Sequence, residues 1–329
     1  MYLNQGFKGE NDWWRYLIGI LVVFIGYFVG QLPLFMVLMA KLSANTNLGT
    51  DALESFQNNM DFEALGVNKN FGFILLILMF VGAILALWVV IKYLHQKQML
   101  DLITTVKSIQ YRKIFFGFGL WMVLTLLLEG ANYVLDPSNY TFRWAGSDYV
   151  VLLLISLLFL PIQTSFEELF FRGYIMQALA FFTKHKWAAV LGSSICFGLV
   201  HGTNPEVAEY GFWTMQSYYI VAGLFLALIT VLDDGLELAL GVHAATNIGG
   251  ATLFTYKGSV LQTDSLFITE EIKPLLMLVG FIFASIIFVL VCYKKYNWPP
   301  LSSLNQGIVD HTVVHDEIKD IGQNQEDPS

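Results

Sequence analysis

Long apolar runs constrain the fold of this chain more than any other feature of its sequence. A helix needs about 20 mostly apolar residues to cross the hydrocarbon core of a bilayer. Eight runs of this kind predict transmembrane helices at residues 16–39, 71–94, 114–135, 149–180, 187–203, 218–232, 236–256 and 274–292. The fourth run is too long for one simple crossing, and Pro161 should break or kink it because proline removes a backbone donor. The sequence therefore predicts an all-α integral membrane protein with about eight transmembrane helices in a bundle.

The composition agrees with this fold class. Only 13% of the 329 residues are charged, whereas soluble domains carry about 25%, so charged side chains cannot cover a water-facing surface. The net charge of −8 leaves no basic patch for nucleic acid. Cys196 and Cys292 both lie in apolar runs, which argues against a disulfide framework. We therefore expect the lipid bilayer as a partner, and no nucleic acid.

The distribution of lysine and arginine predicts the orientation of the chain. Eight spans put both termini on one side, where the flanking basic residues are Lys8, Arg15, Lys92, Lys97, Lys107, Arg112, Lys113, Lys184, Lys186, Lys294, Lys295 and Lys319. The opposite side has Lys41, Lys69, Arg143, Lys257 and Lys273. Because basic residues accumulate in cytoplasmic loops, we expect a multi-pass membrane protein with both termini in the cytoplasm. If the source is prokaryotic, the membrane is the plasma membrane.

Three charged residues lie within the fourth run, where a charge costs at least about 2.5 kcal/mol at mid-bilayer. Glu168 and Arg172 are one helical turn apart, in the order that favours an ion pair. Glu167 points roughly 100° away from Glu168 on the same helix. An ion pair that only locks the helix would explain Glu168 and Arg172, but it would leave Glu167 without a role.

Two histidines occur at a comparable depth in later runs. His201 follows Phe197 by four residues, and His243 precedes Asn247 by four, so each pair shares one face of a helix. Either histidine alone could be a hydrogen-bonded packing residue. Together with Glu167, however, these polar groups are most easily satisfied around one hydrated cavity, since unpaired buried polar groups are costly. We therefore predict a polar intramembrane cavity.

The residues in such a cavity could catalyse hydrolysis by two mechanisms. In the first, a glutamate takes a proton from water with the help of a histidine, while the second histidine and the amide of Asn247 stabilise an oxyanion. In the second, Glu167, His201 and His243 bind zinc and leave an open position for water. Both routes hydrolyse an amide, and the residue types alone leave both open.

The spaced motifs resemble those of a known family. Glu167-Glu168-x-x-x-Arg172, Phe197-x-x-x-His201 and His243-x-x-x-Asn247, in this order, are similar to the motifs of the CAAX prenyl protease and bacteriocin-processing (CPBP, or Abi) intramembrane endopeptidases. The resemblance covers residues 149–256, about a third of the chain.

The resemblance implies a helical protease with a conical cavity that faces the cytoplasmic side. It implies that Glu167 and His201 activate water, that His243 and Asn247 stabilise the oxyanion, and that Glu168 and Arg172 orient the site. Phe197 is then a packing residue of the motif. No cofactor or metal is expected in a glutamate mechanism, although zinc on Glu167, His201 and His243 is the older description of the family.

The motifs divide the chain into four parts. Residues 1–148 hold three spans without a readable motif, and residues 149–256 form the protease-like catalytic core. Residues 257–295 are a loop and the last span. Residues 296–329 carry six acidic residues against one lysine, so we predict a disordered cytoplasmic tail.

Together these features predict an intramembrane endopeptidase that cleaves a membrane-associated or prenylated-like polypeptide. The rival interpretation is a non-catalytic immunity or regulatory scaffold that keeps the fold without the chemistry. A transporter fits less well, because transporters often contain inverted repeats with paired broken helices and this chain has one strongly broken segment.

Overall fold

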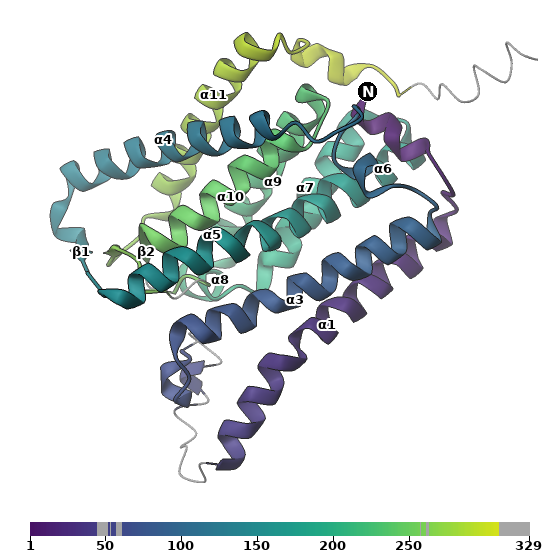
Figure 1. The fold of residues 1–329 in the computed structure, drawn as a ribbon. Coiled ribbons are helices and arrows are strands. Elements are labelled where there is room, and N and C mark those ends of the chain that lie inside the picture. Colours follow the sequence, from purple (N-terminus) through teal and green to yellow (C-terminus); the bar gives the residue numbers. More distant parts are fainter. Residues whose placement is uncertain (45–51, 53, 57–60, 257, 261–262, 309–329) are drawn as a thin grey trace, which may run out of the picture.

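The computed structural model is a bundle of long helices and describes residues 1–44, 52, 54–56, 61–256, 258–260 and 263–308 (Figure 1). Within these residues, six helical segments are long and apolar enough to cross a membrane. They are α1 (Trp13–Ala44), α3 with its π-helical end (Lys69–Leu94), α4 (Tyr111–Leu135), the continuous segment α5–η6–α6 (Ser147–Thr183), α9 (Phe212–Asp233) and α11 (Pro274–Tyr296).

The other two predicted spans correspond to shorter helices. These are α7 (Lys186–Val200), with 15 residues, and α10 (Glu237–Thr252), with 16 residues. Helix α10 packs against α4, α5 and α9, and α7 packs against α6 and α9. Helices therefore occur at all eight predicted positions, and in the described part of the chain six of them are long and apolar enough to cross a membrane. A count of eight crossings stays a prediction.

The fourth segment departs from an ideal α-helix later than predicted. Helix α5 (Ser147–Glu168) continues through Pro161. A π-helical turn, η6 (Leu169–Ile175), follows it and leads into α6 (Met176–Thr183). A π-helical turn is wider than an α-helical one and is frequent at functional sites. The change in geometry thus begins directly after Glu168, between the two partners of the predicted ion pair.

A small sheet and a short helix cap one end of the bundle. Strand β1 (Tyr140–Phe142) pairs antiparallel with β3 (Phe267–Thr269), which pairs parallel with β2 (Phe254–Tyr256). Helix α8 (Pro205–Tyr210) lies between α7 and α9 in the chain. The sheet and α8 lie away from the N-terminus of the chain, at the ends of α4 and α10 where these helices finish (Figure 1). We call this region the sheet end.

The opposite end of the bundle holds both described ends of the chain, and we call it the terminal end. Segment η1 (Tyr2–Phe7) packs on α6. Near the other terminus, the Ile308 backbone N–H donates to the Lys184 carbonyl over 2.9 Å. The remaining short helical turns in the described residues are η2 (Glu63–Leu65), η3 (Val90–Leu94), η4 (Met99–Leu102), η5 (Pro137–Asn139), η7 (His201–Thr203) and η8 (Leu301–Asn305).

The first part of the predicted tail is ordered. Trp298, Leu304 and Ile308 are buried, and the Lys186 ammonium donates to the Ser303 carbonyl over 2.8 Å. The prediction of disorder from residue 296 is therefore wrong up to residue 308, because apolar side chains in this polar segment find a packing surface on the bundle. Residues 309–329, which carry all six acidic residues of the predicted tail, lie outside the described residues.

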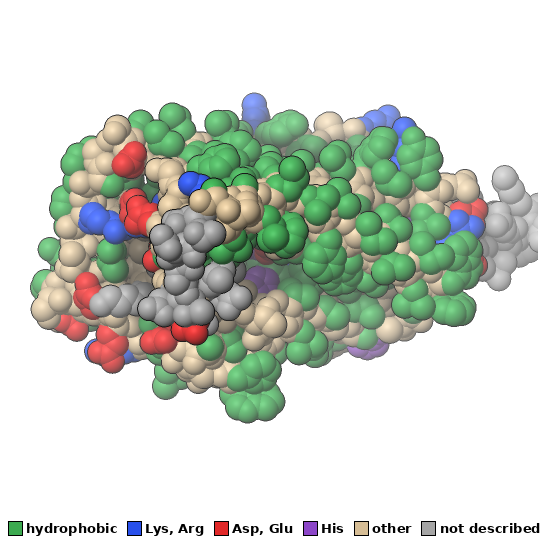
Figure 2. All heavy atoms as spheres, turned by 90° about the horizontal axis from the view of Figure 1, so that it is seen from below, with side chains coloured by type: hydrophobic (Ala, Val, Ile, Leu, Met, Phe, Trp, Pro, Cys, Tyr) green, Lys and Arg blue, Asp and Glu red, His purple; other side chains and the backbone are tan. Residues whose placement is uncertain are grey.

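The outer surface of the bundle is apolar. Helix α1 exposes Leu21, Phe28 and Phe35, and hydrophobic side chains cover much of the face seen in Figure 2. Continuous apolar surface of this extent marks a face that meets lipid or protein rather than water. The interior contains the exceptions: Arg172 is the largest side chain with no exposed surface. A few charged side chains are thus buried inside the bundle, among them Glu168 and Arg172.

Candidate active site

The ion pair predicted from sequence spacing is present and completely buried. Arg172 Nη1 donates to Glu168 Oε1 over 2.8 Å, and Nη2 donates to the Gly223 carbonyl of α9 over 3.1 Å. The guanidinium also lies over the ring of Phe197, with 4.3 Å between Cζ and the centroid. A buried charge is tolerated only when it is paired and hydrogen-bonded. These contacts join η6 to α7 and α9 at one point.

Glu168 also holds the first of the two histidines. His243 Nδ1 lies 2.7 Å from Glu168 Oε1, and since a carboxylate accepts, Nδ1 is the donor. This fixes the imidazole so that its other nitrogen, Nε2, lies 3.5 Å from Glu167 Oε2. One oxygen of Glu168 therefore accepts from both Arg172 and His243. Its second oxygen has no hydrogen-bond partner within the described part of the chain.

The second histidine is oriented in a similar way by a backbone group. His201 begins η7, where α7 ends, and its Nδ1 donates to the Phe197 carbonyl over 2.7 Å. Its Nε2 lies 3.9 Å from Glu167 Oε2. The imidazole is held between two rings, Phe197 at 4.4 Å and Tyr219 at 4.7 Å between centroids. Phe197 is thus a packing residue, and it contacts both His201 and Arg172.

Glu167 is the residue on which the two histidines converge. Both Nε2 atoms face its Oε2, while Gln163 Nε2 donates to its Oε1 over 3.3 Å. Its side chain is 9% exposed and lines a cavity. Glu167 is therefore separate from the Glu168–Arg172 pair, as its position on the helix predicted, and its carboxylate is available at the cavity wall.

Asn247, the last residue of the predicted set, lies one turn after His243 on α10. It is half-buried and lines the same cavity as Glu167, His201 and His243. The structure thus brings four predicted catalytic residues to one wall, with Glu168 and Arg172 behind them. What each of them does in a reaction stays a prediction.

The cavity has a volume of about 1330 Å³ and extends from these residues toward the sheet end. Its lining extends from Phe171 and Leu226 to Asp136, Tyr256 and Glu271 at the sheet end. Most lining side chains are apolar or aromatic. Figure 2 views the molecule from below and shows a histidine inside a hollow, with acidic side chains gathered toward one end.

The position of this cavity bears on two expectations about sidedness, and neither of them is tested by the structure. The resemblance implied a cavity on the cytoplasmic side, and the basic residues implied cytoplasmic termini. In the described chain, no lining residue comes from 95–120, 172–196, 227–241 or 285–308, which are the segments at the terminal end. The cavity therefore lies in the half of the bundle away from both described chain ends, and this position does not fit a cytoplasmic cavity combined with cytoplasmic termini.

The candidate ligands for a metal ion are Glu167, His201 and His243. The two Nε2 atoms and one carboxylate oxygen are suitable ligand types for zinc. Among the residues that the structure describes, however, no group of three or more His, Cys, Asp or Glu side chains is placed so that it could hold a metal ion. We therefore derive no step through a metal, and the zinc alternative remains a prediction from residue types.

A second polar cluster, which the sequence did not predict, lies on the cavity wall. Glu206 accepts hydrogen bonds from Tyr219 and Asn204. Asn204 belongs to the segment that follows His201, but Glu206 and Tyr219 form no spaced motif. The only available signal was an acidic residue next to an apolar span, which alone indicates a position near the headgroups.

Comparisons with known proteins agree with the motif. Residues 146–249 match the family model described as type II CAAX prenyl endopeptidase Rce1-like. The uncharacterized protein YyaK of Bacillus subtilis (strain 168) is 28% identical over 272 residues, which cover 82% of this chain and 87% of that protein. No solved structure matches this chain.

The matched region contains all the motif residues, from Glu167 to Asn247. The resemblance to CAAX-type and CPBP intramembrane endopeptidases is therefore confirmed for this region. Together with the six apolar helices, it supports a multi-pass membrane protein with a CAAX-protease-like domain. A non-catalytic scaffold is not favoured.

Proposed function

We propose that this chain is an intramembrane endopeptidase in which Glu167 activates the attacking water. The proposal rests on one observation: Glu167 Oε2 lies 3.5 Å from His243 Nε2 and 3.9 Å from His201 Nε2, at the wall of a cavity. These distances exceed a direct hydrogen bond, but they suit groups that share a bridging water. A helix-locking ion pair has no need of a carboxylate in this position.

Each residue has a role that follows from its hydrogen bonds. Glu167 takes a proton from the water as the water oxygen attacks the carbonyl carbon of the peptide bond. His201 accepts a hydrogen bond from the same water at Nε2, because its Nδ1 is occupied by the Phe197 carbonyl. The proton then passes to the nitrogen of the leaving amine as the peptide bond breaks. The products are a carboxylic acid and an amine, which then ionise to a carboxylate and an ammonium group.

The oxyanion of the tetrahedral intermediate needs donors on the same wall. The amide of Asn247 is one such donor. His243 donates from Nε2 when both of its nitrogens carry protons, and Glu168 then balances the charge from the Nδ1 side over 2.7 Å. Arg172 keeps Glu168 in place without contacting the substrate. Glu168 and Arg172 are thus positioning residues.

The substrate that fits is a membrane-associated polypeptide. The lining is largely apolar and aromatic, so it can accept an extended chain with hydrophobic or lipid-modified groups. We propose that all eight helical segments cross the plasma membrane and that both termini are cytoplasmic. Since the cavity is lined by segments away from the described chain ends, the scissile bond would then enter from the extracytoplasmic side.

The substitution Glu167→Gln tests this mechanism. It keeps the volume of the side chain but removes the base, so we expect cleavage to fall by at least about 100-fold. Peptides released from membranes that contain wild-type or variant protein would be compared by mass spectrometry. The matched control is Glu63→Gln, because Glu63 is exposed outside the cavity and should be dispensable.

Thermal unfolding in detergent must accompany this comparison, since Glu167 holds no buried charge partner and its variant should stay folded. A folded Glu167→Gln protein that still releases the same peptides contradicts the glutamate mechanism. The same measurement after strong chelation tests the zinc alternative, which requires activity to disappear when the metal is removed.

A further inference from the structure

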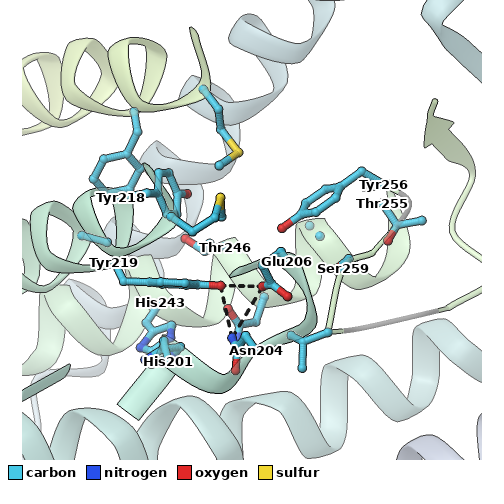
Figure 3. Close-up of a pocket in the computed structure, with 18 of the residues that line it drawn as sticks. His201, Asn204, Glu206, Tyr218, Tyr219, His243, Thr246, Thr255, Tyr256 and Ser259 are labelled. Atoms are coloured by element: carbon cyan, nitrogen blue, oxygen red, sulfur yellow. Dashed lines mark hydrogen bonds between the residues drawn. The ribbon is translucent and has the colours of Figure 1, made fainter. Parts of the chain in front are cut away.

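A second buried carboxylate lies on the cavity wall beside the proposed catalytic residues. Glu206, in α8, is only 3% exposed. Its Oε1 accepts from the Tyr219 hydroxyl over 2.5 Å and from Asn204 Nδ2 over 3.5 Å. Its Oε2 is buried and has no hydrogen-bond partner among the described residues. Figure 3 shows the three side chains pointing toward one another.

Tyrosine rings surround this carboxylate. Tyr218, Tyr219 and Tyr256 line the same part of the cavity (Figure 3). Burial, and secondarily the charge of Glu206, raises the pKa of Tyr256 well above its ordinary value, so this hydroxyl keeps its proton. A carboxylate with neutral tyrosines around it can bind a cation through a charge-assisted hydrogen bond and through the ring faces.

The sheet-end part of the cavity has more acidic than basic side chains. Its described lining includes the carboxylates Glu129, Asp136, Glu206 and Glu271 and one basic residue, Lys273. A cleft with one predominant sign of charge attracts ligands of the opposite sign. The electrostatics therefore favour a substrate that brings a positive group into this part of the cavity.

The cluster is linked directly to the catalytic wall. The ring of Tyr219 stacks on His201 with an interplanar angle of 29°, and its hydroxyl donates to Glu206. A purely structural role, in which Glu206 ties α8 to α9, accounts for Oε1. It does not account for Oε2, because a buried and unpaired charged oxygen is costly to keep.

We propose that Glu206, Asn204 and the surrounding tyrosines form a subsite that binds a lysine or arginine side chain of the polypeptide substrate. This inference rests on the proposed protease function and adds a specificity element to it. The bound cation pairs with Glu206 Oε2 and lies against the tyrosine rings. Because Tyr219 contacts both Glu206 and His201, the basic residue of the substrate lies close to the scissile bond.

The test uses the full chain in lipid vesicles. The probes are lipid-anchored, internally quenched peptides that differ only in carrying lysine or norleucine at each position in turn. We expect one position at which lysine raises kcat/KM at least about 10-fold over norleucine, because a site built around a polar partner rejects an analogue that lacks it. Glu206→Gln should remove this ratio, while Glu209→Gln, on the exposed side of α8, should keep it.

A second measurement tests binding at the subsite without requiring cleavage. Binding of the same fluorescent peptides is measured in the Glu167→Gln background, with and without Glu206→Gln. If the lysine peptide binds more tightly than the norleucine peptide and this difference requires Glu206, the subsite is supported even when no peptide is cleaved. A lack of cleavage then counts against the proposed protease function alone. Equal binding of lysine and norleucine peptides at every position overturns the subsite.

Folding of the variants is checked by thermal unfolding. If Glu206→Gln does not fold, Tyr219→Phe replaces it, since this change keeps the ring against His201 and removes the hydroxyl that orients Glu206. It should lower the lysine preference more than it lowers kcat for norleucine peptides. An unchanged preference in a folded Tyr219→Phe protein contradicts the proposal.

Discussion

At the scale of single residues, two neighbouring glutamates have opposite surroundings. Glu168 has no exposed surface and is shared by Arg172 and His243. Glu167, one position earlier, faces the cavity and the Nε2 atoms of two histidines. The helix separates them by about 100°, so one carboxylate is used for structure and the other is available for chemistry.

This difference predicts that substitutions of the two glutamates affect the stability of the protein to different extents. Glu168→Gln removes the negative partner of a buried guanidinium, and breaking such a pair costs roughly 3–5 kcal/mol. We therefore expect a large loss of thermal stability for Glu168→Gln and a small change for Glu167→Gln, measured on both purified variants in the same detergent. Equal stability of the two variants would mean that Arg172 does not depend on Glu168.

A buried histidine at the terminal end predicts a dependence of stability on pH. His95 has no exposed surface; its Nδ1 donates to the Glu10 carbonyl over 2.7 Å and its Nε2 lies 2.9 Å from the Tyr174 hydroxyl. Burial lowers the pKa of His95 to about 4. Between about pH 6.5 and pH 4, His95 is protonated in the unfolded chain but not in the folded chain. The stability of the folded protein therefore falls as the pH falls.

The size of this effect is on the order of 3 kcal/mol between pH 7 and pH 4, since each unit of pKa difference corresponds to about 1.4 kcal/mol. Thermal unfolding at a series of pH values measures it. His95→Gln keeps a hydrogen-bonding side chain without a titrating proton, so its stability should depend less on pH. Identical pH profiles for both proteins would assign the acid sensitivity to other groups.

At the scale of elements, the approach of α10 to α4 positions two of the four proposed catalytic residues. A Cβ on Gly241 would lie 2.1 Å from the Ile114 carbonyl oxygen of α4, and one on Gly117 would lie 2.7 Å from the Leu238 carbonyl oxygen of α10. Small residues allow this contact between helix backbones. His243 and Asn247 follow Gly241 on the same helix, so the contact fixes their depth.

The pair Gly241→Ala and Gly119→Ala tests this role. Gly119 is in α4, and an added Cβ there meets nothing within 4 Å. Alanine in an open helical position stabilises by about 0.5–1 kcal/mol relative to glycine, so Gly119→Ala should be neutral or more stable. Gly241→Ala must move α10 away from α4, and we expect lower thermal stability together with reduced peptide release. Wild-type behaviour of Gly241→Ala would show that α4 and α10 can separate without harm.

Sequence patterns could predict some of these elements and not others. The apolar runs located the helices because span length is set by the bilayer, and the four-residue spacing located the pair of Glu168 and Arg172. The π-helical turn after Glu168, the packing of Trp298 and the proximity of Glu206 to His201 depend on contacts between distant segments. No local pattern encodes such contacts, so the second polar cluster was missed.

At the scale of the whole molecule, the sidedness of the cavity decides where a product would be released. The described chain ends lie together at the terminal end, and the cavity lies toward the sheet end. Basic residues favour a cytoplasmic location for the terminal end. The arrangement therefore predicts that the active site is open to the extracytoplasmic half of the membrane, where a cleaved polypeptide leaves the cell surface.

Two matched cysteine variants on either side of α4 test this prediction. Ser108 precedes α4 at the terminal end and Ser138 follows it at the sheet end, and both are exposed. Cys196 and Cys292 are first replaced by alanine, and Ser108→Cys or Ser138→Cys is then introduced. A membrane-impermeant maleimide should label Ser138→Cys in intact cells and Ser108→Cys only after permeabilisation. The reverse pattern would place the cavity mouth in the cytoplasm and would contradict the orientation derived from the basic residues.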